Sequence, residues 1–429
     1  MAKDAGIGNV RMVLGSDSSF TAILEDGEVV AWGNPNSRLI SYNHERMRTV
    51  QQIRASDYAF AAVLSDQSVI TWGHHSFGGN SSSVQDQLKN VLDVVSSQRA
   101  FAAMKSDGSV VTWGDPNSGG DSSKVQHQLR RVQKVVSSYD AFAAILLDGS
   151  VVTWGDGGSG GDSCQVHLRS VREIAASGAA FAAILADGRV ETWGDDRYGG
   201  DCSSVKAQLL DVQTICGSAG AFAALRCGGS VVTWGGADYG ADSSRVQGQL
   251  KKVQQIHSTF HAFAAILENG SVVCWGDADS GGDCSSVSDQ LVDVLHISST
   301  GGAFAAALKD GSVITWGNPE YGGDSSSVQH LIRCVGNSLW AFGVLCFWHE
   351  PFVQAVGRRA ITSAADLTAQ EMANVSFGLR TLLCWRRLSN VASYVLMRRQ
   401  SKDPTAAEVS SLEMLLLDGA EGVHVHPDG

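Results

Sequence analysis

Short hydrophobic runs recur at a regular interval along most of the chain. The dipeptide Trp-Gly begins at eight positions that lie 39 to 41 residues apart: Trp32, Trp72, Trp113, Trp154, Trp193, Trp234, Trp275 and Trp316. Twelve residues before each tryptophan stands a phenylalanine: Phe20, Phe60, Phe101, Phe142, Phe181, Phe222, Phe263 and Phe304. Because the offset within each copy is constant, we interpret the chain as one structural unit repeated eight times.

Each copy predicts a β-hairpin preceded by a third strand. Residues 141–146 form an apolar run, Asp148-Gly149 follows, and residues 150–154 form a second β-rich run. Asp-Gly is a typical hairpin turn, since glycine adopts the positive φ that the turn requires. Upstream lies a short run whose apolar residues are three apart, such as Val132 and Val135. The pattern therefore predicts three strands per copy.

Both faces of the predicted sheet are apolar. Successive residues of a strand point to opposite faces, and none of the residues 141–146 is polar. Such a hairpin has to be packed between copies of itself, and radial stacking of sheets produces a β-propeller. We expect an all-β propeller of about eight three-stranded blades, with seven as the alternative. A linear solenoid is the runner-up, but neither the first nor the eighth copy resembles a polar cap.

The connectors between copies predict one short helical turn. In residues 119–129 a Gly pair suits a turn, Asp121 or Ser122 can cap, and Val125 and Leu129 share one apolar stripe. The first connector, residues 34–48, lacks this pattern. A ninth copy starts at Cys334 but has no Trp-Gly strand, and its strands could complete the ring against the first copy.

The repeat carries a family resemblance. The pattern Val-x-x-Ile-x-Ser-Ser-x-x-Ala-Phe-Ala-Ala-Ile-Leu-x-Asp-Gly-Ser-Val-Val-Thr-Trp-Gly resembles the repeat of the regulator of chromosome condensation family. The short period is still more similar to the bacterial β-lactamase-inhibitor propeller, which has three-stranded blades. The resemblance covers about residues 7 to 347 and implies a propeller. It leaves function open, because this fold supports several unrelated tasks.

Three activities of the family can be compared with the sequence. Exchange factors for small GTPases press a long inserted loop against their partner. The connectors here are of nearly constant length and leave no room for such a loop, which disfavours exchange activity. The Gly-Trp-Arg-His-Thr motif of the plant ultraviolet-B photoreceptor is absent. The roughly 80 residues after the repeats are too few for a HECT-type ubiquitin ligase segment.

The C-terminal part has a different character, so we predict two domains: the repeat propeller over residues 1–347 and a helical tail over residues 348–429. Thr368 and Glu371 form a capping box ahead of apolar residues at helical spacing, and Asp403-Pro404 begins a second such segment. About three helices are implied. Residues 369–379 resemble one octotricopeptide-type helical repeat, but a single copy cannot bury a core.

Charge narrows the class of partner. The chain has 32 basic and 44 acidic residues, a net charge of −12, and nearly all of the excess lies in the repeats. This balance disfavours nucleic acid as a partner of the propeller and favours a protein partner that is itself basic. No run of 18 apolar residues and no apolar N-terminal segment is present. We therefore expect no membrane partner and an intracellular location, cytoplasmic or nuclear.

No motif predicts catalysis, a metal or a cofactor. The phosphate loop, the Gly-x-Ser-x-Gly elbow and the His-Glu-x-x-His motif are absent, and no histidine recurs beside the abundant serines. Asp115-x-Asn117-x-x-x-Asp121 and Asp277-x-Asp279-x-x-x-Asp283 are similar to calcium loops, but Asp and Asn are favoured in turns and the bidentate Glu is missing.

The histidines and cysteines are interpreted in the same way. His74-His75 and His424-x-His426 have no third ligand nearby, which favours a surface role. Nine cysteines without Cys-x-x-Cys argue against a disulfide framework or a zinc site. Cys202 and Cys284 occupy positions where other copies have serine, and they are interpreted as serine replacements.

We accordingly expect no catalytic, cofactor-binding or metal-binding residues. The repeated phenylalanines and tryptophans are interpreted as core between blades and not as a stacking surface for bases or sugars. The expected function is a non-enzymatic scaffold for protein–protein interaction. The alternative is a regulator of a small GTPase through guanine-nucleotide exchange, or a substrate-recruiting propeller related to HECT-type ubiquitin ligases.

Overall fold

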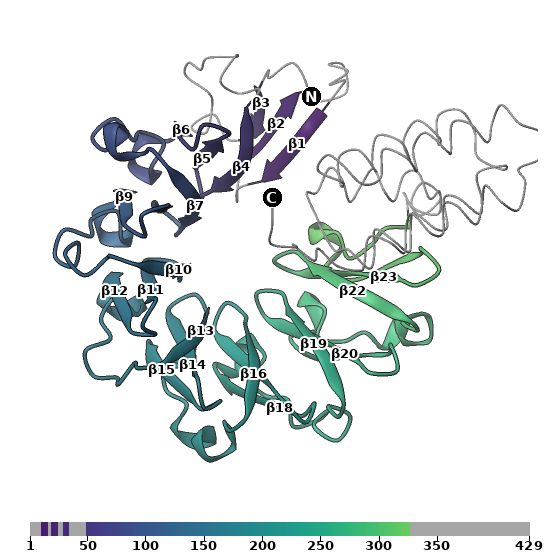
Figure 1. Ribbon diagram of the computed structural model, residues 1–429. Helices are drawn as coiled ribbons and strands as arrows, with labels where there is room; N and C mark the ends of the chain where they lie inside the picture. Colours follow the sequence, from purple (N-terminus) through teal and green to yellow (C-terminus); the bar gives the residue numbers. More distant parts are fainter. Residues whose placement is uncertain (1–9, 16–18, 25–28, 34–48, 327–429) are drawn as a thin grey trace, which may run out of the picture. The chain divides into compact units, whose positions relative to one another are not determined.

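The computed structural model describes residues 10–15, 19–24, 29–33 and 49–326, and its regular elements are strands and 3-10 helices (Figure 1). These residues form eight three-stranded sheets, each built from three consecutive strands. The predicted three strands per copy are therefore confirmed. The first connector, the ninth copy from Cys334, the boundary at residue 347 and the predicted tail helices lie outside the described residues.

The strands have nearly the same lengths in every sheet. Their bounds are β1 Val10–Gly15, β2 Ser19–Leu24, β3 Val29–Gly33; β4 Val50–Ala55, β5 Ala59–Leu64, β6 Val69–Gly73; β7 Val91–Ser96, β8 Ala100–Lys105, β9 Val110–Gly114; β10 Val132–Ser137, β11 Ala141–Leu146, β12 Val151–Gly155; β13 Val171–Ala176, β14 Ala180–Leu185, β15 Val190–Gly194; β16 Val212–Gly217, β17 Ala221–Arg226, β18 Val231–Gly235; β19 Val253–Ser258, β20 Ala262–Leu267, β21 Val272–Gly276; β22 Val294–Ser299, β23 Ala303–Leu308, β24 Val313–Gly317.

The 3-10 helices are short. One kind follows the third strand of a sheet: η2 His75–Phe77, η4 Pro116–Ser118, η5 Gly157–Ser159, η6 Asp196–Tyr198, η8 Ala237–Tyr239, η9 Ala278–Ser280 and η11 Pro319–Tyr321. The other kind lies in the connectors: η3 Gln85–Gln87, η7 Ser203–Gln208 and η10 Ser285–Gln290. Among the described residues, no helix has the length and apolar character needed to cross a membrane.

By its internal contacts the chain divides into two compact units. The first comprises Met1–Ala306 and Ile314–Asp324, and the second comprises Ala307–Val313 and Ser325–Gly429. Within the first unit the sheets follow one another in chain order, and the first strand of each sheet contacts the first strand of the next, from β1 through β22 (Figure 1). The first strand is therefore the inner strand of each sheet.

Register is the same in the seven sheets from β1 to β21, and all their pairs are antiparallel. In the β10–β12 sheet, Phe142 lies opposite Trp154 and Ala143 opposite Thr153. The inner strand carries a bulge, since Val132 pairs with Leu146 while Lys134 pairs with Ile145. A bulge raises the local twist of a strand. It leaves Val132 and Val135 both buried, which explains the three-residue spacing of apolar positions in the sequence.

The core lies between neighbouring sheets. Phe142, which is fully buried, stacks on Trp154 with ring centroids 5.3 Å apart. Both pack with Ala100, Ala102 and Val110 of the preceding sheet. The same pairing of phenylalanine with tryptophan occurs in the other sheets from β4 to β24, which places Phe60, Phe101, Phe181, Phe222, Phe263, Phe304, Trp72, Trp113, Trp193, Trp234, Trp275 and Trp316 among buried residues.

A glycine of the preceding copy completes this contact. The Trp154 indole Nε1 donates to the Gly119 carbonyl oxygen at 3.0 Å. Gly119 has φ +90°, and a Cβ added there would lie 2.5 Å from the Phe142 ring. A side chain is therefore excluded at this position by both backbone conformation and space.

The predicted helical turn of the connector takes the 3-10 form or remains a hydrogen-bonded turn. It is 3-10 in η3, η7 and η10, whereas residues 123–128 form turns. The Asp121 carboxylate accepts from the Ser123 N–H at 2.8 Å, as expected for a capping residue. Leu129 is fully buried and Val125 half-buried, so this stripe does face the core.

Candidate functional site

The two ends of each sheet from β4 to β24 carry different kinds of loop. At one end the inner strand turns into the second strand, and the residues after the third strand pack against that turn: Asp115 N–H donates to the Arg99 carbonyl oxygen at 2.9 Å. At the opposite end lie the hairpin between the second and third strands and the start of the inner strand, joined by the bond from Ser106 N–H to the Asn90 carbonyl oxygen at 2.8 Å. We call these the triplet end and the hairpin end.

The triplet end takes its name from three residues that close each inner strand from β4 to β22. They are residues 55–57, 96–98, 137–139, 176–178, 217–219, 258–260 and 299–301. The middle residue is always Ser or Thr. The Ser97 hydroxyl donates to the Ser118 carbonyl oxygen at 2.9 Å and accepts from the Ala100 N–H at 3.0 Å. These hydroxyls hold the turn to the 3-10 helix of the same sheet, which gives the recurrent serine a structural role.

The third residues of the triplets link one sheet to the next. Each N–H donates to the third residue's carbonyl oxygen in the following sheet, at 2.8 to 3.0 Å: Asp57 to Gln98, Gln98 to Tyr139, Tyr139 to Gly178, Gly178 to Ala219, Ala219 to Phe260 and Phe260 to Gly301. First-position serines add side-chain links, such as the Ser137 hydroxyl to the Ser96 carbonyl oxygen at 2.7 Å. The triplets thus form a continuous hydrogen-bonded rim over seven sheets.

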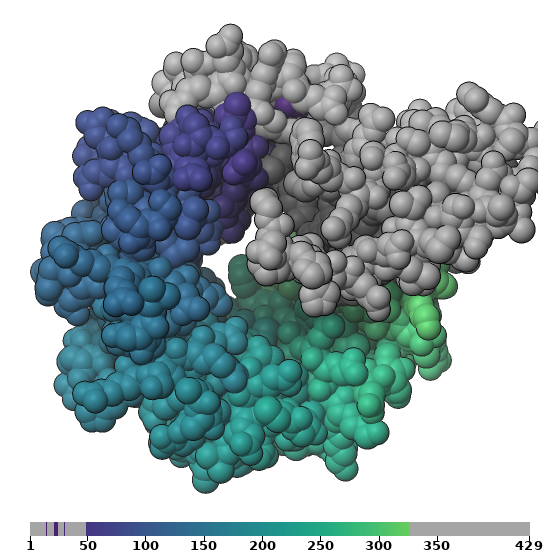
Figure 2. Space-filling view, in the orientation of Figure 1, coloured from purple at the N-terminus to yellow at the C-terminus, as the bar shows by residue number. Residues whose placement is uncertain are grey.

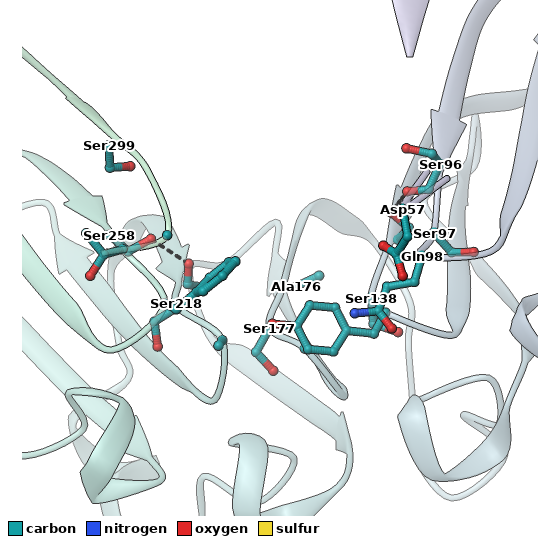
Figure 3. Close-up of a pocket in the computed structure, with 18 of the residues that line it drawn as sticks. Asp57, Ser96, Ser97, Gln98, Ser138, Ala176, Ser177, Ser218, Ser258 and Ser299 are labelled. Atoms are coloured by element: carbon teal, nitrogen blue, oxygen red, sulfur yellow. Dashed lines mark hydrogen bonds between the residues drawn. The ribbon is translucent and has the colours of Figure 1, made fainter. Parts of the chain in front are cut away.

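This rim surrounds a cavity of about 890 Å³, lined by all seven triplets. Figure 2 shows the hollow between the blue, teal and green sheets, and Figure 3 shows hydroxyl groups of several triplets around it. The dashed bond in Figure 3 belongs to Ser258, whose hydroxyl donates to the Gly217 carbonyl oxygen at 2.7 Å. Hydroxyl groups of this kind make the wall of the cavity polar.

The third triplet residues give the rim its chemical variety. In chain order they are Asp57, Gln98, Tyr139, Gly178, Ala219, Phe260 and Gly301. A Cβ added at Gly178 would lie 2.4 Å from the Tyr139 ring, and one added at Gly301 would lie 2.7 Å from the Phe260 ring. Each aromatic ring therefore covers a glycine of the next sheet.

A second, smaller cavity of about 330 Å³ adjoins Phe260 at the triplet end. We call it the aromatic–acidic pocket. It is lined by Phe260, His261, Asp277, Asp279, Ser280, Gly301, Gly302, Asn318 and Tyr321. Phe260 is 48% exposed and Tyr321 is 51% exposed, whereas the repeated phenylalanines are buried. The pocket thus combines accessible rings with carboxylates.

Hydrogen bonds orient several pocket residues. The Ser280 hydroxyl donates to the Asp277 carboxylate at 2.7 Å, and the Glu320 N–H donates to the Asn318 side chain at 2.9 Å. His261 stacks on Tyr239 with ring centroids 5.0 Å apart. Tyr239 in turn lies 5.5 Å from Tyr198, ring centroid to ring centroid. A hydrogen bond with Tyr198, together with partial burial, raises the pKa of the Tyr239 hydroxyl.

The triplet end is acidic over its whole described extent. Its loops in the first unit contain the acidic residues Asp57, Asp115, Asp140, Asp156, Asp195, Asp196, Asp238, Asp277, Asp279 and Glu320, and the basic residues Arg99 and Arg197. Arg197 is paired with Asp195 at 2.6 Å, and that hydrogen bond lowers the pKa of the Asp195 carboxyl. By contrast, basic residues at the hairpin end, such as Lys89, Arg130, Arg131, Lys251 and Lys252, are interspersed with acids.

At the triplet end, one aromatic ring already contacts a cationic side chain. The Arg99 guanidinium lies over the Phe77 ring, 5.2 Å from its centroid, and 3.8 Å from the Asp115 carboxylate. Phe77 and Tyr321 are equivalent, since each ends the 3-10 helix after the third strand. The loops of this end are thus able to place a guanidinium between a ring and a carboxylate.

The residues with possible metal-binding spacing lie in turns. The Asn117 N–H donates to Asp115 at 3.0 Å, and the Ser285 N–H donates to Asp283 at 2.9 Å, which is turn chemistry. His74 accepts from the Ser76 N–H at 3.3 Å and stacks on His75. Within the described ranges, no group of three or more His, Cys, Asp or Glu side chains could hold a metal ion. His424 and His426 lie outside the described residues.

The sequence reasoning did not identify the rim or the pocket. The signal was present at positions where a fixed repeat varies: the third triplet residue is Phe only at 260, and the last residue of the 3-10 helix is aromatic in some copies and Ser in others. At both positions the residue type differs between copies, whereas the phenylalanine and tryptophan of the repeat are the same in every copy.

Several solved structures are similar to this chain at low identity. The chain is similar to the CRINKLY WD40 ectodomain of the Arabidopsis thaliana receptor kinase ACR4, with 17% identity, 62% of this chain and 96% of that chain covered, and a TM-score of 0.35. It is similar to yeast RCC1 (Prp20), solved bound to Kap60, with 18% identity, 63% and 70% covered, and a TM-score of 0.35. It is also similar to human WBSCR16, with 16% identity, 68% and 84% covered, and a TM-score of 0.37.

No protein-family model matches the chain, and no curated protein sequence matches it. The three structural matches all have TM-scores below 0.5, and the proposed function rests on the chain's own residues.

Proposed function

We propose that this protein is a non-enzymatic scaffold whose triplet end binds a basic segment of a partner protein. The observation that carries the proposal is the aromatic–acidic pocket, where the exposed rings of Phe260 and Tyr321 stand beside Asp277 and Asp279. A Lys or Arg side chain suits such a pocket, because a cation is attracted both by the ring face and by the carboxylate.

The surrounding charge supports the same class of partner. The acids of the triplet end outnumber its bases, and one of the two bases is paired within its own loop. A surface of one sign attracts a partner of the opposite sign and raises the rate of association. The Arg99–Phe77–Asp115 cluster supplies the precedent within the chain for how an arginine is held.

The wall of the larger cavity supports the absence of catalysis. The hydroxyls of Ser97, Ser138 and Ser177 donate to backbone carbonyl oxygens, and no histidine is among the described residues that line this cavity. Without a base to take its proton, a serine hydroxyl is a weak nucleophile. Accelerated nucleotide release from a small GTPase by catalytic amounts of the protein would overturn the scaffold proposal and favour the exchange-factor alternative.

Binding of a fluorescein-labelled oligo-arginine peptide, followed by fluorescence anisotropy, tests the proposal. The probe should bind more tightly than an oligo-glutamate peptide of equal length and lose affinity as salt rises. Tyr321→Ala and Asp279→Asn should each weaken binding about threefold to tenfold, the range for one cation–π contact or charge pair. Asp289→Asn, an exposed acid of the connector η10, is the matched control and should bind as the unchanged protein does.

Two results would contradict this assignment. One is equal affinity for the arginine and glutamate peptides. The other is equal weakening by Asp289→Asn and Asp279→Asn, because binding would then depend on net charge and not on the pocket.

We also propose that the eight sheets are eight blades of one closed propeller. The inner strands contact in chain order, and the rim of backbone hydrogen bonds turns through seven sheets around one cavity. In a closed ring the first sheet packs against the last sheet. The outer apolar faces of these two sheets are then covered.

A further inference from the structure

A hydrogen-bonded Thr–Ser pair recurs between the third strand and the connector. The two residues are ten apart in sequence, and their hydroxyl oxygens lie 2.9 to 3.0 Å apart in four sheets: Thr71 with Ser81, Thr112 with Ser122, Thr153 with Ser163 and Thr233 with Ser243. The pair fastens the start of each connector to its sheet.

In the β19–β21 sheet both members of this pair are cysteine. Cys274 lies opposite Ala264, the register that Thr153 has with Ala143 in the β10–β12 sheet. Cys284 is ten residues further on, at the position of Ser163. Both cysteines are buried, with 7% and 9% of their surfaces exposed. They stand at the two positions whose hydroxyl oxygens lie 2.9 to 3.0 Å apart in the four sheets with a Thr–Ser pair.

The β19–β21 sheet has cysteine at both positions of the pair, whereas the β13–β15 sheet has cysteine at one. The β13–β15 sheet has Thr192 and Cys202 at the two positions, so only one member is a thiol. The connector glutamine that bonds the serine elsewhere, as Gln126 bonds Ser122 at 2.7 Å, is replaced here by Ser288. The side-chain contact between the third strand and this connector is therefore made by the two sulfur atoms and not by hydroxyl groups.

We propose that Cys274 and Cys284 are a covalent modification site: a vicinal dithiol that a peroxide converts to an intramolecular disulfide. One thiolate attacks a peroxide oxygen, and the O–O bond breaks, leaving a sulfenic acid and one water. The second thiol attacks the sulfenic sulfur, the S–O bond breaks, and the S–S bond forms with release of a second water. The two sulfur atoms lose two electrons in total, and the two peroxide oxygens gain them.

The surroundings assign an order to the two steps. The hydrogen bond from Cys274 lowers the pKa of the Cys284 thiol, and burial raises the pKa of the Cys274 thiol. Thiolate is the reactive form, so Cys284 attacks the peroxide and Cys274 resolves the sulfenic acid.

The cross-link would close the loop that carries three residues of the aromatic–acidic pocket. Asp277, Asp279 and Ser280 all lie between the two cysteines. The disulfide itself is independent of the proposed binding function, and it can form whether or not the pocket binds a cationic peptide.

Treatment of the full chain with hydrogen peroxide tests the inference. Free thiols are then alkylated after unfolding, and fragments from cleavage before aspartate are identified by mass spectrometry. Asp277, Asp279 and Asp283 lie between the cysteines, so the linked state appears as two peptides joined by one disulfide. We expect this pair to appear with peroxide and to disappear with dithiothreitol.

Variants supply matched controls. Cys274→Thr with Cys284→Ser restores the pair found in four sheets and should fold normally without forming the link. Thr192→Cys should create a second dithiol with Cys202 and a second peroxide-dependent link. The proposal is overturned if peroxide oxidises exposed Cys164 while Cys274 and Cys284 both remain alkylatable, or if either cysteine is found joined to a different one.

Discussion

At the scale of single residues, the contact between sheets depends on where a side chain is absent. Gly119 leaves room for the Phe142 ring and offers its carbonyl oxygen to Trp154. Gly78, Gly160 and Gly199 make the same contacts with the next sheet, each with φ near +90°. A tryptophan, a phenylalanine and a glycine from two copies thus form one unit of packing.

Gly119→Ala should destabilise the protein by about 2 kcal/mol or more, because the new Cβ meets the Phe142 ring and the left-handed backbone is strained for alanine. Urea denaturation measures the change. Gly248→Ala is the matched control, since nothing lies within 4 Å of the Cβ added there. It should change the free energy of unfolding by about 0.5 kcal/mol at most. Similar losses in both variants would show that the close approach to Phe142 is unimportant.

At the scale of elements, aspartates organise the hairpins and connectors. The Asp148 carboxylate accepts from the Ser150 N–H at 2.9 Å and the Ser150 hydroxyl at 2.6 Å, and Asp107 does the same with Ser109. These hydrogen bonds, the serine hydroxyl's foremost, lower the pKa of the Asp148 and Asp107 carboxyls below the ordinary value of 3.8. The carboxyl pKa is also lowered in the connector aspartates, which are Asp121, Asp162, Asp201, Asp242 and Asp283.

This predicts how stability depends on pH. A lowered pKa means that the folded state binds fewer protons than the unfolded state, so the stabilisation is complete above pH 3.8 and is lost as pH falls through the folded-state pKa. The contribution of these aspartates to the free energy of unfolding, measured in urea, should be constant from about pH 7 to 5 and should decrease below about pH 4. Asp107→Asn with Asp148→Asn keeps an amide acceptor but cannot titrate, and it should fall less steeply. An unchanged slope would contradict the assignment.

At the scale of the whole molecule, the number of sheets and the number of blades are separate questions. Eight sheets are present among the described residues, and seven of them contribute a triplet to one cavity. The closed eight-bladed ring is a proposal, because residues 16–18 of the first copy and the ninth copy lie outside the described residues.

An experimental density map of the full chain should show eight blades in one ring. The physical reason is that each sheet has two apolar faces, and only closure covers the outer faces of the first and last sheets. A ring of seven blades with one hairpin outside it, or an open spiral, would contradict the proposal. A ninth incomplete blade that closes the ring with the first sheet would revise the count.

Three features could be predicted from the sequence alone: the repeat, the three strands of each copy, and the positions of Phe142 and Trp154. A fixed offset between an aromatic pair and an Asp-Gly turn permits few local structures, so strand positions follow from local chemistry. The expectation of turn chemistry at Asp115 and Asp121 also agrees with their hydrogen bonds.

Features that depend on residues far apart in the chain could be identified only in the folded protein. The rim joins triplets 39 to 41 residues apart, and the aromatic–acidic pocket combines loops of two sheets. Arg99 comes to lie over Phe77, and Cys274 meets Cys284, only because strand register and the path of the connector bring them together. Hydrophobic periodicity specifies which face of a strand is buried but not which side chains of neighbouring copies meet at its end, since that depends on how the sheets stack.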